Sequence, residues 1–372
     1  MGNNKAPVWE CKPRTKAKLE ILNGYLGAWF NILGPKFKRV VYLDGFCGPG
    51  RYSTGEYGSP VIAIEHASIV ANNHPGFRAE IICIDKDQEK LDYLLRLPSV
   101  MNRHKNIELH VFQGTFESRV RGIFEKLNIP ERTPAFCFID PFGFGESPYE
   151  LIRPLVRNDS TELVINFWCG FMNRFKEHPN PQIPERIKGM VGSNNLDRVI
   201  NSGNPISELC DVYQETLSQI GKFTLRFMML NEKNQPDNAL FFCGNNTRGF
   251  QKIKEAMWKI DPVNGCGFSA LNEVTASTQD LFGFVNEPDS HQLGIMLMEE
   301  FRGQKITVEE LEKWTVEKTE TYHGKHLRKE LERLYSQDNP AQRKINYFDP
   351  KQTGRKRSRG HWPVRLVIEF IG

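Results

Sequence analysis

The feature that most constrains the fold is a glycine-rich loop between an apolar run and a helix start. Residues 40–60 read VVYLDGFCGPGRYSTGEYGSP, and the apolar run ends at Asp44. Ser59 and Pro60 are residue types preferred at the N-cap and the first position of a helix. The loop between them holds three glycines: Gly45, Gly48 and Gly50. A strand, a loop and a helix in this order build nucleotide-type cofactor sites in α/β sheets.

Four more strand-like runs follow, and a helical pattern separates each from the next. Apolar runs predict strands over residues 40–43, 79–84, 107–112, 135–139 and 162–167. Helical spacing predicts helices over residues 15–33, 60–72, 88–97, 116–127 and 148–156. We expect Thr15 to cap the first helix, and Gly34 and Pro35 to end it. This alternation predicts an α/β fold with a parallel sheet and helices on both of its faces.

The next segments predict a reversal of strand direction. Residues 172–205 are rich in Pro, Asn and Gly, which indicates an insertion, and residues 208–220 and 250–260 have helical patterns. Two apolar runs, 223–230 and 239–243, are joined by a loop so short that the strands can only pair antiparallel. A parallel series closed by an antiparallel hairpin is the order of a Rossmann-like methyltransferase sheet. Simple dehydrogenase sheets do not usually end this way.

The C-terminal residues differ in kind. Three helical patterns, over residues 293–301, 308–314 and 324–335, precede two strand-like runs at residues 345–348 and 366–370. The segment between these two strands, KQTGRKRSRG, is strongly basic. Three helices and a basic-tipped hairpin are the pattern of a winged helix. We therefore expect a Rossmann-like methyltransferase domain over residues 1–288, with a helical insertion at about residues 170–205, and a winged-helix domain over residues 289–372.

The loop and the strand ends supply the candidate cofactor site. Asp85 directly follows the second apolar run, where an acidic side chain accepts hydrogen bonds from a ribose diol. Asp87 is the competing residue, and its simpler interpretation is a helix N-cap. The candidate cofactor-binding residues are Asp44, Gly45, Phe46, Gly48, Gly50, Ser59, Asp85 and Thr115.

The spacing of the loop favours one cofactor class. Eight residues, 51–58, separate Gly50 from the helix start, whereas a GxGxxG loop opens directly into its helix. The chain also lacks a GKS or GKT phosphate-binding motif. Both features disfavour NAD and ATP. They favour S-adenosylmethionine, a cofactor without phosphates, whose carboxylate can meet the amide groups near Ser59.

A second constellation follows the fourth strand, where the chain reads Asp140-Pro141-Phe142-Gly143. A carboxylate at this strand tip projects into the crevice beside the cofactor. The Asp140 side chain and the Pro141 carbonyl would accept the two N–H bonds of an exocyclic amine, and Phe142 would stack on a planar group. The simpler alternative is a turn that merely leaves the strand. Asp140, Pro141 and Phe142 are the candidate catalytic residues.

Basic residues mark the C-terminal domain as the candidate nucleic-acid interface. They lie on the third predicted helix and in the hairpin tip: Lys325, Arg328, Lys329, Arg355, Lys356, Arg357 and Arg359. Phosphates are the natural partner of such a helix and wing. The alternative is a protein-binding winged helix, because Glu330 and Glu332 interrupt the helix and a charged helix is usually a solvated face.

Composition excludes several other classes of protein. No apolar run approaches the roughly 20 residues of a membrane span, and the N-terminal residues form no secretory signal. The 8 cysteines are scattered and form no CxxC pair, so we expect neither a metal site nor a disulfide framework. We expect a cytoplasmic protein without a membrane partner. The net charge of +4 is only mildly basic, so the clustered basic residues say more about a nucleic-acid partner.

Several stretches together resemble the three-Cys-motif partner protein family, TcmP. They are TKAKL and YLGAW at residues 15–29, DGFCGPG, GEYGSP, FIDPFG, VINF with NRF at residues 173–175, and AMWKIDP at residues 256–262. They cover most of residues 9–285, and Arg14 stands where the family has a histidine. The resemblance implies a class I S-adenosylmethionine-dependent methyltransferase fold. It also implies a partner protein that carries a three-cysteine motif of the radical-S-adenosylmethionine kind.

The Asp-Pro-Phe-Gly stretch is separately similar to the strand-four motif of amino-directed nucleic-acid methyltransferases, with Phe142 where their motif has proline. The sequence thus predicts an S-adenosylmethionine-dependent methyltransferase that acts on an amine, most simply of a nucleic-acid base. The alternative is an accessory factor that binds nucleic acid or protein and keeps an idle Rossmann-like domain.

Overall fold

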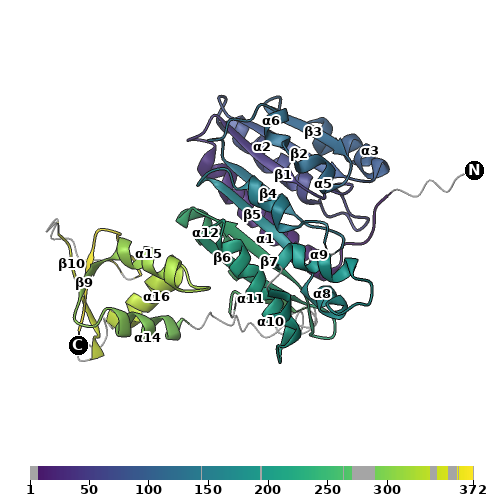
Figure 1. The fold of residues 1–372 in the computed structure, drawn as a ribbon. Coiled ribbons are helices and arrows are strands. Elements are labelled where there is room, and N and C mark those ends of the chain that lie inside the picture. The colour runs from purple at the N-terminus through teal and green to yellow at the C-terminus, as the bar shows by residue number, and fades with distance from the viewer. Residues whose placement is uncertain are drawn as a thin grey trace, which may run out of the picture.

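The computed structural model describes residues 7–143, 145–192, 195–262, 264–269, 290–335, 342–350, 358 and 360–371. A large α/β part and a smaller C-terminal part meet at α12 (Figure 1). The large part is built on an eight-stranded sheet, and the small part on a three-stranded one. Among the described residues, no helix combines the length and apolar character needed to cross a membrane.

The large sheet has the strand order β3-β2-β1-β4-β5-β7-β6-β8. Its strands are β1 (Arg39–Asp44), β2 (Arg78–Asp85), β3 (Ile107–Gln113), β4 (Ala135–Ile139), β5 (Thr161–Phe167), β6 (Phe223–Leu230), β7 (Pro236–Gly244) and β8 (Gly267–Ser269). The first five strands pair in parallel, and β7 runs antiparallel to both β5 and β6. This confirms the predicted parallel series closed by an antiparallel hairpin. The strand β8, which pairs in parallel with β6, was not predicted.

Helices cover both faces of this sheet. One face packs against α1 (Pro13–Leu33), α2 (Ser59–Asn73), α3 (Gln88–Arg96), α4 (Pro98–Met101) and α12 (Thr247–Ile260). The other packs against α5 (Phe116–Val120), α6 (Ile123–Lys126), α7 (Tyr149–Ile152) with the short 3-10 turn η1 (Arg153–Leu155), α9 (Gln182–Val191), α10 (Leu196–Ile200) and α11 (Pro205–Ser218). Alternate residues of β1 enter the two cores, Val40 and Tyr42 on one side and Val41 and Leu43 on the other. The segment after β5 is helical and begins with α8 (Cys169–Phe175).

Helix boundaries differ from the predicted ones for local reasons. The first helix begins at Pro13 with Lys12 as its N-cap, so the predicted Thr15 cap is wrong. The second begins at Ser59 with Gly58 as its N-cap, one residue before the expected cap. The predicted helix over residues 116–127 is two short helices, because Gly122 takes a positive φ of 63° between them. The first helix ends at Leu33 before Gly34, as expected.

The C-terminal part has its own apolar core. It consists of α14 (His291–Glu300), β9 (Lys305–Thr307), α15 (Val308–Lys318), α16 (Gly324–Tyr335), β10 (Ile345–Phe348) and β11 (Val367–Phe370). The strands form an antiparallel sheet in the order β10-β11-β9, of which β9 was not predicted. Most of the basic hairpin tip, including Arg355, Lys356, Arg357 and Arg359, lies outside the described residues.

Candidate functional site

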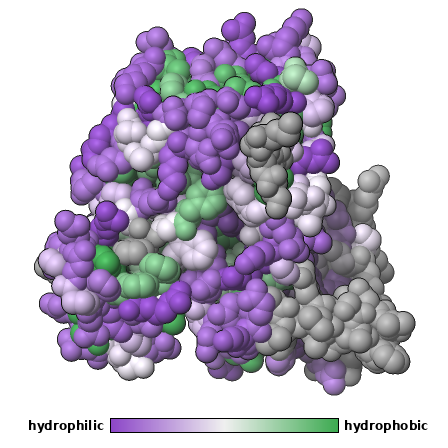
Figure 2. Space-filling model, turned by 90° about the vertical axis from the view of Figure 1, so that its right-hand side faces the viewer, coloured by the Kyte–Doolittle hydropathy of each residue, from purple (hydrophilic) through white to green (hydrophobic). Residues whose placement is uncertain are grey.

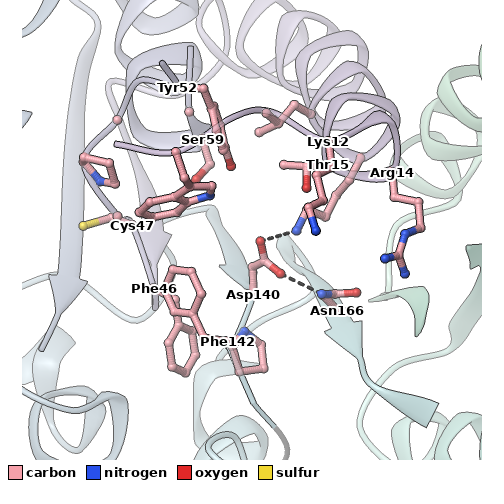
Figure 3. Close-up of a pocket in the computed structure, with 18 of the residues that line it drawn as sticks. Lys12, Arg14, Thr15, Phe46, Cys47, Tyr52, Ser59, Asp140, Phe142 and Asn166 are labelled. Carbon is pink, nitrogen blue, oxygen red and sulfur yellow. Dashed lines mark hydrogen bonds and ion pairs between the residues drawn. The ribbon is translucent and has the colours of Figure 1, made fainter. Parts of the chain in front are cut away.

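A cavity of about 230 Å³ lies where strands β1, β4 and β5 end. Its walls come from the glycine loop, the tip of β4 and the start of α1 (Figure 3). Predicted site residues that line it are Phe46, Gly48, Gly50, Ser59, Asp140, Pro141 and Phe142. Four predicted residues do not line it: Asp44, Gly45, Asp85 and Thr115.

Asp44, the last residue of β1, is fully buried. Its carboxylate accepts hydrogen bonds from the Tyr42 hydroxyl (3.0 Å) and from the N–H of Phe46 (3.3 Å). Burial raises the pKa of Asp44 to about 7, the hydrogen bonds oppose this shift, and the charge of Asp140 adds to it. A buried carboxylate poised in this way stabilises a positive charge brought close to it.

Two glycines of the loop are required for different reasons. Gly45 lies against the ring of Phe116, which a Cβ atom would approach to 2.8 Å, so packing demands this glycine. Gly48 has a positive φ of 59°, and a Cβ there would meet only Trp9, at 3.8 Å, beside the cavity. The Gly48 position therefore leaves the space that a ligand needs when it approaches the backbone.

Asp85 supports the loop from behind. Its Oδ2 accepts the N–H of Gly48 (3.0 Å) and its Oδ1 accepts the N–H of Asp87 (2.9 Å). Asp87 in turn caps α3 by accepting the N–H of Glu89 (3.0 Å), the simpler role considered for it. Thr115 is exposed and caps α5. The role of Asp85 in holding Gly48 is one that the sequence pattern did not reveal.

The carboxylate of Asp140 is the centre of a polar network. Its Oδ2 pairs with Nζ of Lys18 from α1, and its Oδ1 accepts a hydrogen bond from the Asn166 amide (2.7 Å) at the end of β5 (Figure 3). Asn238 of β7 donates to the side-chain oxygen of Asn166. Three segments far apart in sequence, α1, β5 and β7, therefore fix the orientation of the Asp140 side chain.

Aromatic side chains surround the rest of the strand tip. The Pro141 carbonyl accepts the indole N–H of Trp168 (2.7 Å), so one of its two lone pairs is already used. Phe142 is 48% exposed and meets Trp9 edge-on, with ring centroids 5.8 Å apart. Nζ of Lys90 lies 4.6 Å from the Phe142 ring centroid. An apolar wall with polar groups beside it suits a planar ligand with polar edges.

The start of α1 contributes residues that were not predicted as site residues. Lys12, Arg14, Thr15 and Lys18 all line the cavity, and Arg14 forms an ion pair with Asp237. The cavity therefore has a basic wall facing Asp140. The TKAKL stretch entered the sequence analysis only through a family resemblance, and its spacing alone gives no sign that it reaches a strand 122 residues away.

The basic residues of α16 have two different environments. Arg328 forms an ion pair with Glu312 of α15, which lowers its value as a phosphate ligand. Lys325 and Lys329 are exposed and line a groove between α16, α12 and α1. The structure thus separates three residues that the sequence grouped together.

Of three comparisons with known proteins, the comparison with solved structures is the one that gives matches. No family model matches the chain, and no curated protein does. Solved structures that resemble it include a Legionella pneumophila protein of the DUF519 family, with 15% identity, a TM-score of 0.36, and coverage of 60% of this chain and 84% of that one. A putative O-methyltransferase from Klebsiella pneumoniae has 11% identity and a TM-score of 0.32, over 63% of this chain and 91% of that one. A putative caffeoyl-CoA O-methyltransferase from Staphylococcus aureus has 12% identity and a TM-score of 0.28, over 59% and 82%.

These likenesses are too weak to carry an assignment. The strand order identifies the fold. A parallel series of strands closed by an antiparallel pair is the methyltransferase-type arrangement of a Rossmann-like sheet. Membership of the TcmP family stays a prediction. The chain has a methyltransferase-type α/β fold with a polar and aromatic cavity at the carboxyl ends of its strands.

Proposed function

We propose that this chain is an S-adenosylmethionine-dependent methyltransferase that acts on an amine of a nucleic-acid base. One observation carries the proposal. The Asp140-Pro141-Phe142 tip and the glycine loop, from Phe46 to Gly50, form walls of the same cavity. A methyl donor held by the loop would therefore face an acceptor held by the tip.

The residues present fit S-adenosylmethionine. Gly48 leaves open space beside the cavity, and Ser59 begins the 15-residue helix α2 at the cavity wall. Asp44 is fully buried and does not line the cavity, so it would act on an ammonium group through its charge and not by direct contact. Asp85 would hold Gly48 in place, while the other predicted residues would shape the loop. The bound cofactor supplies an electrophilic methyl group. No metal is needed for this chemistry.

The chain would catalyse the transfer mainly by orientation. A carboxylate has about four lone-pair sites, so Asp140 can accept an amine N–H while it still binds Lys18 and Asn166. The free lone pair of the Pro141 carbonyl can accept a second N–H, and Phe142 can contact the plane of a base. The negative charge of Asp140 then stabilises the positive charge that develops on the attacking nitrogen.

The first experiment is calorimetric titration with S-adenosylhomocysteine, for which we expect a single site. Absence of binding at millimolar ligand would refute the proposal. In a transfer assay with labelled cofactor and cellular nucleic acid, Asp140→Asn should reduce the rate by roughly 10²-fold through lost orientation, with little change in S-adenosylhomocysteine affinity. Asp159→Asn, at an exposed position, is the matched control. Mass spectrometry of nucleosides from cells with and without the chain identifies the acceptor.

The Lys18–Asp140 ion pair favours a second candidate function. It satisfies the carboxylate without any substrate, as in an accessory factor with an idle Rossmann-like domain. In that case Asp140→Ala leaves the biological function intact, and removal of the basic segment at residues 355–359 abolishes it. An active methyltransferase gives the opposite ranking of these two variants.

The C-terminal part and the partner belong to the same proposal. Three helices with an antiparallel sheet agree with a winged helix, whose basic hairpin would bind nucleic acid. We also propose a cytoplasmic partner protein with a three-cysteine motif, which rests on the family resemblance alone. Co-purification of tagged protein tests it, and recovery without any such partner contradicts it.

A further inference from the structure

A groove rich in lysine lies between the two parts of the chain. It has a volume of about 420 Å³, and its walls come from α1, α12 and α16. Four lysines line it, two from the methyltransferase-type part and two from the C-terminal part: Lys252, Lys259, Lys325 and Lys329. We call it the lysine groove.

The charges of the groove are unbalanced. Among its lining residues Glu255 is the single carboxylate, and it pairs with Lys252 at 2.7 Å. Burial lowers the pKa of His323 to about 3 and that of His326 to about 4, and the neighbouring lysine charges act in the same direction. Both imidazoles are therefore neutral at pH 7, and four lysines face one carboxylate.

The walls of the groove are held together by buried hydrogen bonds. Lys254 of α12 is 1% exposed, and its Nζ donates to the carbonyl oxygens of Val316 (2.8 Å) and Thr319 (2.5 Å) at the end of α15. The indole N–H of Trp258 donates to the carbonyl of Thr321 (2.7 Å). The lysines of α12 and α16 thus keep a fixed spacing, so a ligand need not order the two parts when it binds.

The floor of the groove is formed by small residues of α1. Gly24 and Ala28 line it, and a Cβ atom at Gly24 would lie 3.7 Å from Ala256 and 4.0 Å from Nζ of Lys259. The small floor leaves room beside the end of the Lys259 side chain. Lys259, Lys325 and Lys329 are all exposed, so a ligand reaches them from solvent.

We propose that the lysine groove binds the phosphodiester backbone of a nucleic acid. The inference rests on the proposed function, in which the methyl acceptor is a nucleic-acid base. Lysines contact phosphates as point charges, whereas they are depleted in protein–protein interfaces. The large aromatic residue of the groove, Trp258, is only 7% exposed, so the groove offers a partner protein no apolar pocket for an anchoring side chain.

Figure 2 shows a different face of the molecule, the right-hand side of Figure 1, which lies away from the C-terminal part. This face is mostly hydrophilic, and among the coloured residues the hydrophobic ones form small patches.

The test is fluorescence anisotropy of labelled single-stranded RNA, single-stranded DNA and duplex DNA with the full chain at several salt concentrations. Four phosphate contacts predict a slope of log K against log salt of about −3 for a single strand. Lys325→Glu with Lys329→Glu should weaken binding at least tenfold and reduce the slope by about half. Lys259→Glu should also weaken binding, because the groove is shared between the two parts.

The matched control is Lys126→Glu with Arg132→Glu. It makes the same charge change at exposed positions in and after α6, across the sheet from the groove. An equal loss of affinity in this control, a flat salt response, or no effect of Lys259→Glu would overturn the proposal. Stronger displacement by polyglutamate than by unlabelled oligonucleotide would also overturn it, in favour of an acidic protein partner.

The same variants are titrated with S-adenosylhomocysteine. If the lysine variants keep both their cofactor binding and their nucleic-acid affinity, the lysine groove is not the nucleic-acid site. The methyltransferase proposal is then unaffected. If nucleic-acid binding depends on the four lysines but the chain binds no S-adenosylhomocysteine, the groove is supported as the nucleic-acid site. The proposal that the chain uses S-adenosylmethionine is then refuted.

Discussion

The buried carboxylate of Asp44 allows the sharpest test of the candidate cofactor site. The substitution Asp44→Asn keeps the shape of the side chain and removes its charge. In the folded chain this carboxylate is fully buried at the end of β1, with the Tyr42 hydroxyl and the Phe46 N–H as donors. The variant therefore tests how much the buried charge lowers stability without a change in the shape of the loop.

The magnitude follows from the raised pKa. Burial raises the pKa of Asp44 from 3.8 to about 7, a difference worth about 4 kcal/mol. Between these two values the unfolded chain has lost a proton that the folded chain still holds, so stability falls as the pH rises from about 4 to about 7. Asp44→Asn should abolish this fall. Its gain in unfolding free energy at pH 8 should be about 3 kcal/mol, after about 1 kcal/mol is subtracted for a weakened hydrogen bond.

Although Asp44→Asn should be the more stable protein at pH 8, it should bind the cofactor product more weakly than the unmodified chain does. The charge of the buried Asp44 carboxylate would attract the ammonium group of S-adenosylhomocysteine across the cavity wall, an interaction worth about 2–3 kcal/mol at an effective dielectric constant of about 20. We therefore expect Asp44→Asn to bind this ligand about 10- to 100-fold more weakly at pH 8. Urea denaturation from pH 5 to pH 8 measures the first effect, and calorimetry measures the second.

The control is Asp159→Asn, which removes a charge at an exposed position. It should leave both the stability profile and the ligand affinity as in the unmodified chain. The reasoning is refuted if Asp44→Asn lowers stability at pH 8 as much as at pH 5, since burial of the charge would then not dominate. Unchanged S-adenosylhomocysteine affinity would show that the charge of Asp44 does not act on the ligand.

Two further predictions concern residues outside the candidate site, one about packing and one about a buried lysine. Gly249→Ala would place a Cβ atom 1.7 Å from Oε1 of the buried Glu162, so it should cost more than 3 kcal/mol in urea denaturation, whereas Gly76→Ala, at an open position, should cost less than about 1 kcal/mol. Burial lowers the pKa of Lys254 to about 7, while the charge of Glu320 opposes this. The unfolded chain then binds more protons than the folded chain between about pH 7 and the ordinary lysine pKa near 10.4. Stability should rise with pH across that window, and Lys254→Met should flatten the rise in thermal unfolding measured from pH 7 to pH 10; an equal slope in both proteins would contradict this.

Much of the fold could be predicted because buried parallel strands are continuous apolar runs. Each of the first five runs ends near a polar or turn residue, such as Asp44 or Asp85, and the structure confirms all five strands. The short strands β8 and β9 have three residues each, too few to show a pattern. Their pairing depends on neighbours that fold beside them, β6 and β11.

The candidate site, like the fold, could be predicted only in part from the sequence. The glycine loop and Asp140 are local motifs, so sequence spacing shows them. Lys18 and Asn238 reach the cavity only after α1 and β7 have packed, and their polar partners lie far along the chain. Asp85 was predicted from its place at a strand end, but its hydrogen bond to Gly48 depends on the path of the loop.

The Lys254 contact has a consequence for how this protein can be divided. Sequence composition changes near residue 289, which invites expression of residues 1–288 alone. Such a fragment would lack the carbonyl groups of Val316 and Thr319, leaving the ammonium of Lys254 and the indole N–H of Trp258 without their acceptors. The boundary that the sequence suggests, near residue 289, therefore does not separate two parts that are stable independently of each other. A useful fragment needs α15 and α16, or substitutions that remove both donors from the exposed surface of α12.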